Sequence, residues 1–289
     1  MVTLASLKQT KKTSTKYDIF IIAPHPSRDF KNALKKLCST DFKIRLVRVK
    51  NRYRSYQKSR NPITTTALLK FDIPHLFKTY DRILYLDSDI IATQDLSQLL
   101  NFPLTDVYAA VVKDMVAHFD GNLERLHLFA YFNSGVMLFN LHKMRQDLMT
   151  DQLIQLKKAD PWQYFMDQDT FNVAFQHKVS FISPHYNYML ENRLYSKRVL
   201  ADFYGLTHQE VLNLLKKPIL IHYSSQRKPW KIITSYHDMW MQSYSFLFQL
   251  LHEVPLIAGF HENLRQQVPL NQRHKVFSTP PSKKDNLTA

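Results

Sequence analysis

Short apolar runs alternate along this chain with segments of helical periodicity, and few folds accommodate such an order. The runs YDIFIIA (17–23), RILYL (82–86) and PILIHY (218–223) have the length and composition of buried strands. Helical segments lie between them, including DFKNALKKLC (29–38) and a longer one at about 143–157. This alternation predicts an α/β fold with a mainly parallel sheet flanked by helices.

Shorter elements complete the predicted order. We expect further strands at 42–50, 107–112, 136–141 and 179–183, and further helices at 64–71, 94–100, 167–176 and 235–253. The absence of a repeat or a clear linker indicates one main domain. The predicted division is a flexible N-terminus (1–16), a main domain (17–232), a helical extension (233–264) and a polar basic tail (265–289).

Composition excludes several classes of protein. The 289 residues contain only 4 glycines, and neither G-x-G-x-x-G nor G-x-x-x-x-G-K-[ST] occurs. The single cysteine, Cys38, excludes an internal disulfide framework and a cysteine-based zinc site. No apolar stretch approaches the ~18 residues of a membrane span, and the N-terminal residues lack a signal-peptide core. We therefore expect a soluble, cytoplasmic protein.

Two acidic residues directly follow an apolar run in RILYLDSDII (82–91). Because side chains alternate in an extended chain, Asp87 and Asp89 point the same way and Ser88 the opposite way. A divalent cation is a usual partner of such a pair, and oxygen ligands suit Mg, Mn or Ca. In open α/β sheets, ligands bind beyond the carboxyl ends of strands, where this pair falls. The alternative is a turn in which one of the acids caps the helix at 94–100.

The run LIHYSSQRKPW (220–230) supplies a second signal, because His222 and Lys228 follow an apolar strand. A histidine in this position is most often structural. An imidazole beside two carboxylates, however, makes a mixed nitrogen and oxygen site that favours Mn over Mg. A cation together with a nearby lysine would neutralise a diphosphate.

Two further runs contain small or acidic residues at the ends of elements. YFNSGVMLFNL (131–141) places Asn133 and a small polar turn before a strand, where a ligand can approach closely; the alternative is an ordinary loop. FMDQDTFN (165–172) places Asp167, Gln168 and Asp169 at the start of a helix. Acids at that position also serve as caps and dipole partners.

Together and in this order, the four runs resemble glycosyltransferase family 8, the retaining enzymes that include bacterial lipopolysaccharide galactosyltransferases and glycogenin. The resemblance covers roughly 64–230. It implies a GT-A fold in which 17–232 form the nucleotide-sugar-binding catalytic domain. It also implies transfer of galactose or glucose from a UDP-hexose donor to a glycan, glycolipid or glycoprotein acceptor. The implied cofactor is Mn²⁺, with Mg²⁺ as an alternative.

The resemblance further implies roles for individual residues. Asp87, Asp89 and His222 would be the metal ligands. Gln168 would orient the donor and stabilise the developing cation, while Asp167 would act either as a covalent or ion-pairing carboxylate or by hydrogen bonding to the sugar. The positions that match donor-binding residues are Ala23, Lys70, Asp87, Ser88, Asp89, Asp114, Asn133 and Lys228.

Three features depart from the family pattern. His25 and Pro26 stand where an acidic residue is expected shortly after the first strand, which puts uracil recognition in question. Ser225 replaces a glycine expected between His222 and Lys228. The segment between the first strand and Lys70 is also shorter than usual, which indicates reduced acceptor-side loops.

The net charge is +15, from 39 Lys and Arg against 24 acids, and it favours binding to polyanions. Other functions are therefore considered as alternatives. The segment 43–60 holds eight basic residues and no acid, with Tyr53 and Tyr56 interleaved, as in a groove for single-stranded nucleic acid. The acid pair would repel phosphates and disfavours such a module. Peripheral contact with an anionic inner membrane face is a further alternative. A phosphatase of the haloacid dehalogenase type is disfavoured by Ile91, the fifth position of its D-x-D-x-[TV] pattern.

Overall fold

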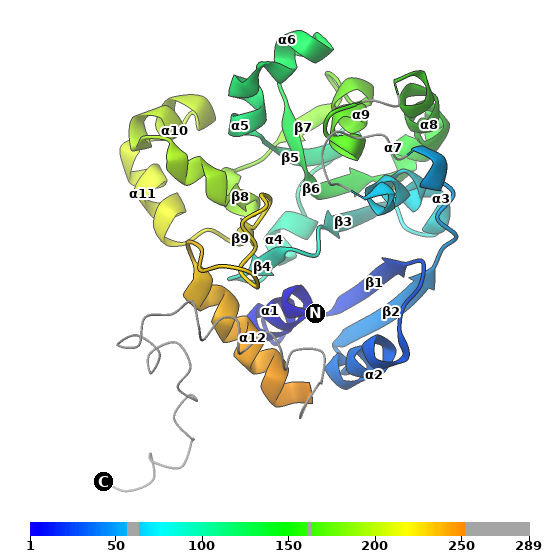
Figure 1. Ribbon diagram of the computed structural model, residues 1–289, viewed down its shortest axis with the longest axis vertical. Helices are drawn as coiled ribbons and strands as arrows, with labels where there is room; N and C mark the ends of the chain where they lie inside the picture. Colours follow the sequence, from blue (N-terminus) through cyan, green and yellow to red (C-terminus); the bar gives the residue numbers. More distant parts are fainter. Residues whose placement is uncertain (57–63, 161–162, 252–289) are drawn as a thin grey trace, which may run out of the picture.

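The computed structural model describes residues 1–56, 64–160 and 163–251, and it is a mixed α/β molecule with helices flanking its sheets (Figure 1). The strands are β1 (Tyr17–Ala23), β2 (Phe42–Arg48), β3 (Arg82–Leu86), β4 (Ile90–Ala92), β5 (Ala109–Lys113), β6 (Phe132–Asn140), β7 (Val179–Phe181), β8 (Tyr188–Met189) and β9 (Leu220–His222).

Helices connect most of these strands. The α-helices are α1 (Val2–Thr10), α2 (Arg28–Leu37), α3 (Ile73–Leu76), α4 (Ser97–Leu100), α5 (Met115–Ala117), α6 (Leu123–Leu126), α7 (Leu141–Gln146), α8 (Met149–Ala159), α9 (Met166–Ala174), α10 (Lys197–Tyr204), α11 (His208–Lys216) and α12 (His237–Leu251). Tighter 3₁₀ turns are η1 (Arg54–Tyr56), η2 (Thr65–Asp72), η4 (Pro184–Tyr186) and η5 (Leu190–Leu194), and η3 (His118–Asn122) is a π-turn.

The described strands form three sheets, with orders β1-β2, β3-β6-β5-β7 and β4-β9-β8. Three pairs are parallel (β1·β2, β5·β7, β8·β9) and three are antiparallel (β3·β6, β5·β6, β4·β9). The expectation of a mainly parallel sheet was therefore wrong. The antiparallel strand β6 is buried on both faces, and its apolar part VMLF (136–139) therefore resembles a segment of a buried parallel strand.

The strands differ in burial. All residues of β6 except the last are buried, with Phe139 packed on Phe171 of α9 and Leu138 in a second cluster with Leu220 of β9. By contrast, β1 beyond Tyr17 and the whole of β3 are at most half-buried, although both apolar runs were expected as buried strands. The difference follows from position, because each of the two strands lies at the edge of its sheet.

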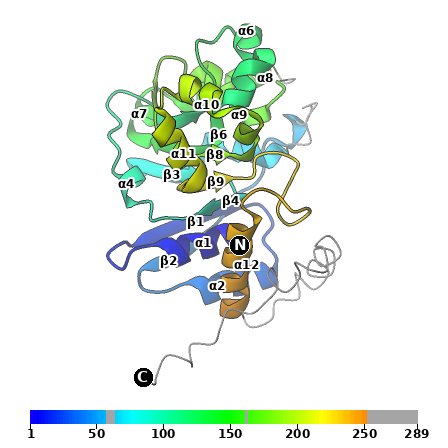
Figure 2. The ribbon, with the colours of Figure 1, turned by 90° about the vertical axis from the view of Figure 1, so that its left-hand side faces the viewer.

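The N-terminal residues differ from the flexible arm that we expected. Val2–Thr10 forms helix α1, in which Leu4, Ala5 and Leu7 are buried. Helix α1 packs beside α12, where Leu247 and Leu251 join the same apolar cluster (Figures 1 and 2). The apolar residues at 4–7 cover only about one helical turn, which is too short to predict a helix from the sequence. The helix is stabilised by packing against α12.

The C-terminal helix agrees with expectation, since α12 occupies most of the predicted 235–253. The end of the predicted extension and the basic tail at 265–289 lie outside the described residues. The helix expected at 143–157 is divided into α7 and α8 at Leu148, whose φ is 50°. Within the described ranges, no helix is both long and apolar enough to cross a bilayer.

Candidate functional site

The acid pair lies in the turn that joins β3 to β4. The Asp87 backbone N–H donates to the Gly135 carbonyl at 2.8 Å, which anchors the turn to β6. The Tyr223 N–H donates to the Asp89 carbonyl at 3.0 Å, which anchors it to the chain after β9. Two different parts of the fold therefore hold the two ends of a three-residue turn, which limits the positions that both carboxylates can take.

His222 reaches the acid pair through strand pairing. It ends β9 and stands opposite Ile90 in the antiparallel pair with β4, directly after the acid turn. Its Nε2 lies 3.2 Å from Asp89 Oδ1 and 3.8 Å from Asp87 Oδ2. The three potential ligand atoms all lie within 4.8 Å of one another. Residues more than 130 positions apart in the chain thus form one nitrogen and oxygen cluster of the kind that Mn²⁺ accepts.

Gly135 leaves the space that the imidazole needs. A Cβ at this position would lie 2.2 Å from His222 Cε1 and 2.8 Å from its Nδ1. Any larger residue would displace the ring from the acid pair. We expected the Asn-Ser-Gly run to be a turn that a ligand approaches; instead it lies inside β6, and the close approach is that of His222.

Asn187 fixes the orientation and tautomer of His222. Its Nδ2 donates to Asn133 Oδ1 at 2.9 Å, so its own Oδ1 faces His222 Nδ1 at 3.0 Å. An amide oxygen only accepts, so Nδ1 carries the proton. In a neutral ring Nε2, which faces the two carboxylates, then has a free lone pair. A hydrogen bond to the second ring nitrogen is the usual support of a metal-binding histidine.

Asp89 supplies the observation that tests the fit of a cation. Its Oδ1 is buried and accepts no hydrogen bond from the described part of the chain, although His222 Nε2 is close. Its Oδ2 accepts from Lys228 Nζ at 2.5 Å. Burial alone would raise the pKa of Asp89, but His222 and Lys228 outweigh it and lower that pKa. The residue is therefore a partly buried carboxylate with one buried, unused oxygen directed at an imidazole, which fits a divalent cation.

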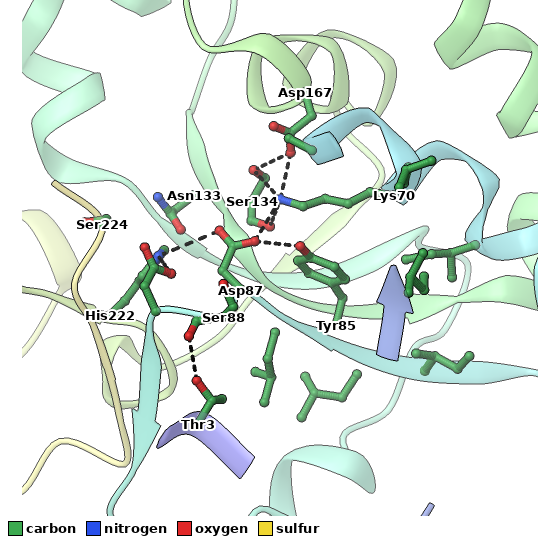
Figure 3. A pocket seen from close by; sticks show the side chains of 18 of the residues that line it. Thr3, Lys70, Tyr85, Asp87, Ser88, Asn133, Ser134, Asp167, His222 and Ser224 are labelled. Atoms are coloured by element: carbon green, nitrogen blue, oxygen red, sulfur yellow. Dashed lines mark hydrogen bonds and ion pairs between the residues drawn. The ribbon is translucent and has the colours of Figure 1, made fainter. Parts of the chain in front are cut away.

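Lys70 joins the acid pair to the start of α9. Its buried Nζ lies 3.3 Å from Asp87 Oδ1 and 2.8 Å from Asp167 Oδ2. Burial opposes its charge, yet Asp167 and Asp87 together raise the pKa of Lys70. Tyr85 donates to the same Asp87 oxygen at 2.6 Å. Figure 3 shows Lys70, Tyr85 and His222 reaching Asp87, while Asp167 contacts Lys70 from the other side.

A buried hydrogen-bond network connects the remaining predicted residues. Ser134 donates through Oγ to Asp167 at 2.9 Å, and its backbone N–H donates to Gln168 Oε1 at 2.9 Å. Gln168 Nε2 and Asn133 Nδ2 both donate to Asp114 Oδ2, at 3.3 and 3.2 Å. Burial is the main reason that the pKa values of Asp114 and Asp167 are raised. These side chains are held in fixed orientations beside the acid pair.

Three of the residues singled out in the sequence do not direct their side chains into this cluster. Ala23 ends β1, whereas the cavity lining along that strand ends at Ile22. Ser88 is exposed, and its carbonyl accepts from Thr3 Oγ1 at 2.7 Å. Asp169 points away from the cluster and pairs with Arg125 and Tyr131, so the structural reading holds for this acid.

The structure also bears on two alternatives from the sequence, a capping role for the acid pair and a nucleic-acid groove at 43–60. The helix at 94–100 is supported by Asp95, whose Oδ1 accepts from the Ser97 N–H at 2.9 Å, and not by either acid of the pair. Tyr53 is only 2% exposed and donates to Asp72, so it does not present its ring to a nucleic acid. Residues 57–60 of the basic segment lie outside the described part of the chain.

A cavity of about 1240 Å³ opens at this cluster. The candidate side chains that line it are Lys70, Asp87, Ser88, Asp89, Asp114, Asn133, Asp167, Gln168, His222 and Lys228. Among them, Lys70 pairs with Asp87 and Asp167, and Lys228 pairs with Asp89. The arrangement provides a place for a cation, a phosphate group and a polyhydroxylated ligand.

Comparison with known proteins agrees with this arrangement. The sequence model described as Glycosyl transferase family 8 matches residues 1–234. A lipopolysaccharide 1,2-glucosyltransferase of Escherichia coli K12 is 35% identical over 160 residues, which are 53% of this chain and 45% of that protein. Glycosyltransferase GlyD of Streptococcus pneumoniae is 32% identical over 174 residues, 56% of this chain and 19% of that protein. The chain thus spans less than half of each of these relatives.

Solved structures show the same fold. The galactosyltransferase LgtC, in a complex with donor and acceptor sugar analogues, superposes with a TM-score of 0.71 at 20% identity, covering 95% of this chain and 94% of that one. The bifunctional glycosyltransferase WbbM gives a TM-score of 0.68 at 22% identity, covering 91% and 49%. The expected GT-A fold is confirmed.

Proposed function

This chain is a member of glycosyltransferase family 8, and from that premise we propose that it transfers a hexose from a UDP-sugar to an acceptor hydroxyl with retention of configuration, in a reaction that requires Mn²⁺. Galactose and glucose are the candidate hexoses. The acceptor belongs to a glycan, glycolipid or glycoprotein. Names among the relatives support a glycan product, because they include lipopolysaccharide glucosyltransferases.

The convergence of Asp87, Asp89 and His222 is the observation that carries the proposal. These groups come from the β3–β4 turn and from β9, and strand pairing brings them together. Their donor atoms are one imidazole nitrogen and carboxylate oxygens, a set that suits Mn²⁺ better than Mg²⁺. When bound, the ion would supply positive charge against the diphosphate of the donor.

Two lysines add positive charge on either side of this cluster. Lys228 extends from the loop after β9 to Asp89, and Lys70 extends from η2 to Asp87. Both would contact phosphate oxygens of the donor while keeping their carboxylate partners in place. Fixed charges in a partly buried site stabilise a departing diphosphate more than they would in water.

Gln168 is suited to orienting the sugar. Both ends of its amide are occupied, with Oε1 accepting from the Ser134 N–H and Nε2 donating to Asp114. Its dipole is therefore fixed, and Oε1 retains a second lone pair that can face developing positive charge at the anomeric carbon. Asp167 shares its charge with Lys70, so we assign it to positioning Lys70 and binding sugar hydroxyls.

Membrane contact is retained as a proposal for a lipid-linked acceptor. The exposed residues Lys43 and Arg45, which share one face of β2, would face an anionic surface, each contributing about 1 kcal/mol. Helix α12 is not offered for this role, because Trp240, Tyr244 and Leu247 are buried against the rest of the molecule.

Hydrolysis of a panel of UDP-sugars, with and without Mn²⁺, tests the proposal. We expect slow release of UDP from one UDP-hexose only when the metal is present. Release of phosphate from a simple phosphate ester without any UDP-sugar would instead support the phosphatase alternative. Metal-independent turnover of every donor would contradict the role given to the cluster.

A further inference from the structure

The cavity has a second region that the proposed donor site does not need. Besides the charged cluster, its lining includes every residue of β1 from Tyr17 to Ile22 and every residue of β3. Its volume of about 1240 Å³ is larger than the ~300–1,000 Å³ of most ligand pockets. A nucleotide sugar at the charged cluster would leave the space between these two strands unfilled.

Both strands present an unpaired edge to this space. Among the described residues, β1 pairs with β2 alone and β3 with β6 alone. Successive side chains of a strand point to opposite faces, so a cavity lined by all of them faces the edge of the strand. Open edges with apolar side chains are normally paired or covered.

The faces of β1, by contrast, are already covered. Ile19 and Ile21 pack on the cluster formed by α1, α2 and α12. Phe20 and Ile22 pack on the opposite cluster, where Phe20 lies 4.8 Å from the ring of Phe77. A strand with apolar residues on both faces and helices over both is typical of the interior of a sheet. Here it stands at an edge and is only half-buried.

The path of the chain indicates how this gap is bordered. Helix α1 begins beside the turn after β3, where Thr3 donates to the Ser88 carbonyl (Figure 3). It leads to the start of β1, where Tyr80, just ahead of β3, donates to Asp18 at 3.2 Å. Helix α1 therefore runs from the site end of the gap to its opposite end. A right-handed β-α-β unit containing α1 and β1 requires a strand that ends where α1 begins.

We infer that the gap between β1 and β3 is a slot for one further β-strand, parallel to both and carried on polypeptide that leads directly into Met1. An apolar segment of about seven residues, the length of β1, would fill it. Its backbone would complete the ladders of both neighbours. Its side chains would join the clusters that contain Ile21 on one face and Phe20 on the other.

One consequence rests on the proposed function. The inserted strand would end beside Ser88, at the edge where the donor site lies. Ligands of open α/β sheets bind beyond the carboxyl ends of their strands, so the last residues of the insert would contact the donor. Strand β1 would then be the second strand of the sheet, which accounts for His25 and Pro26 standing where an acid was expected.

Fusion of a designed strand to the full chain tests the slot. One version carries Val-Thr-Ile-Val-Ile-Val-Ala and a three-residue turn before Met1; a second carries a Gly-Ser segment of equal length. We expect the apolar version alone to raise Tm by roughly 5–10 °C. We also expect amide hydrogen exchange in β1 and β3 to slow at least about tenfold, with β5 and β6 unchanged.

A third version separates strand pairing from simple apolar covering. Replacing two of the seven residues by proline removes N–H donors while keeping the segment apolar, and we expect it to lose the protection. Equal Tm and equal exchange in all three versions would overturn the inference, as would protection that requires a second copy of the chain. None of these measurements uses donor turnover, so their failure is distinguishable from failure of the proposed function.

Discussion

Burial and the neighbouring charges shift the pKa of Asp89 in opposite directions. Burial disfavours its carboxylate, while a protonated His222 at 3.2 Å and Lys228 at 2.5 Å stabilise it, and its pKa is lowered overall. The side chain is therefore ionised at neutral pH, with one oxygen bonded to Lys228 and the other available to a cation. A neutral isostere would keep the shape of the site and remove its charge.

We predict that Asp89→Asn reduces sugar transfer and donor hydrolysis to below about 1% of the parent activity, because a neutral amide is a poorer ligand for the cation whose charge would stabilise the departing diphosphate. The protein should remain folded, since the amide fills the same space. Circular dichroism and UDP release with Mn²⁺ measure the two effects. Retained Mn²⁺-dependent turnover in a folded Asp89→Asn protein would remove the metal assignment.

Gln168 is predicted to act on the rate rather than on donor binding. In Gln168→Ala we expect kcat to fall about 10²-fold, because an oriented dipole next to the anomeric carbon is lost. Donor affinity should be largely kept, since the lysines and the acid pair are untouched. Steady-state kinetics and UDP-sugar titration separate the two quantities. An unchanged kcat would exclude Gln168 from the mechanism.

Gly135 provides a test of the metal site that changes no ligand. The added Cβ of Gly135→Ala would collide with the His222 ring, so we expect metal affinity to fall about 10–100-fold. Gly205→Ala is the control, because Gly205 has a φ of 65° and open space around it. That variant should lose stability without losing metal affinity. Equal Mn²⁺ affinities in the two variants, measured by calorimetry, would contradict the role of Gly135.

At the scale of elements, sequence patterns located the longer strands and helices well. The run at 17–23 coincides with β1, and 29–38 overlaps α2 within a residue at each end. Strand direction could not be predicted, because the segment 136–139 of the antiparallel β6 is as apolar as a buried parallel strand. Strand β8, with two residues, was too short to produce a periodic signal.

The same limits applied to the site. Asp87, Asp89 and His222 were predicted because they lie at the ends of the apolar runs RILYL (82–86) and PILIHY (218–223), which include β3 and β9, and because these motifs resemble family 8. Asn187 was missed because it precedes the unrecognised β8, and only tertiary structure brings it to the His222 ring. Tyr85 had a usable signal, since it is two residues before Asp87, which directly follows the same strand, and an extended chain therefore directs both side chains to the same side.

Helices α1 and α12 lie at opposite ends of the described chain yet share one apolar cluster. We predict that Leu247→Ala lowers the free energy of unfolding by about 2–5 kcal/mol, because Leu247 is 1% exposed in that cluster. The control is Gln249→Ala on the exposed face of α12, with an effect within about 0.5 kcal/mol. Urea unfolding measures both. Similar values for the two variants would mean that α1 and α12 do not stabilise the domain together.

For the molecule as a whole, the candidate site is built from side chains of two different sheets and of helix α9. Asp87 and Asp89 follow a strand of the second sheet, His222 belongs to the third, and Asp167 starts α9. A ligand that contacts all of them at once binds only when these parts are packed together. Donor and metal binding should therefore report on global folding as well as on local geometry.

We predict that UDP and Mn²⁺ together raise Tm by roughly 5–10 °C at ligand concentrations about 100 times Kd, since such binding contributes ~2.7 kcal/mol and each kcal/mol corresponds to about 2–4 °C in a domain of this size. UDP alone should give a much smaller shift, because without the cation the acid pair repels the diphosphate. In Asp89→Asn the metal-dependent part should vanish. Equal shifts with and without Mn²⁺ in the parent protein would show that the nucleotide binds without the cluster, and the reaction proposed for this chain would then need a different source of charge.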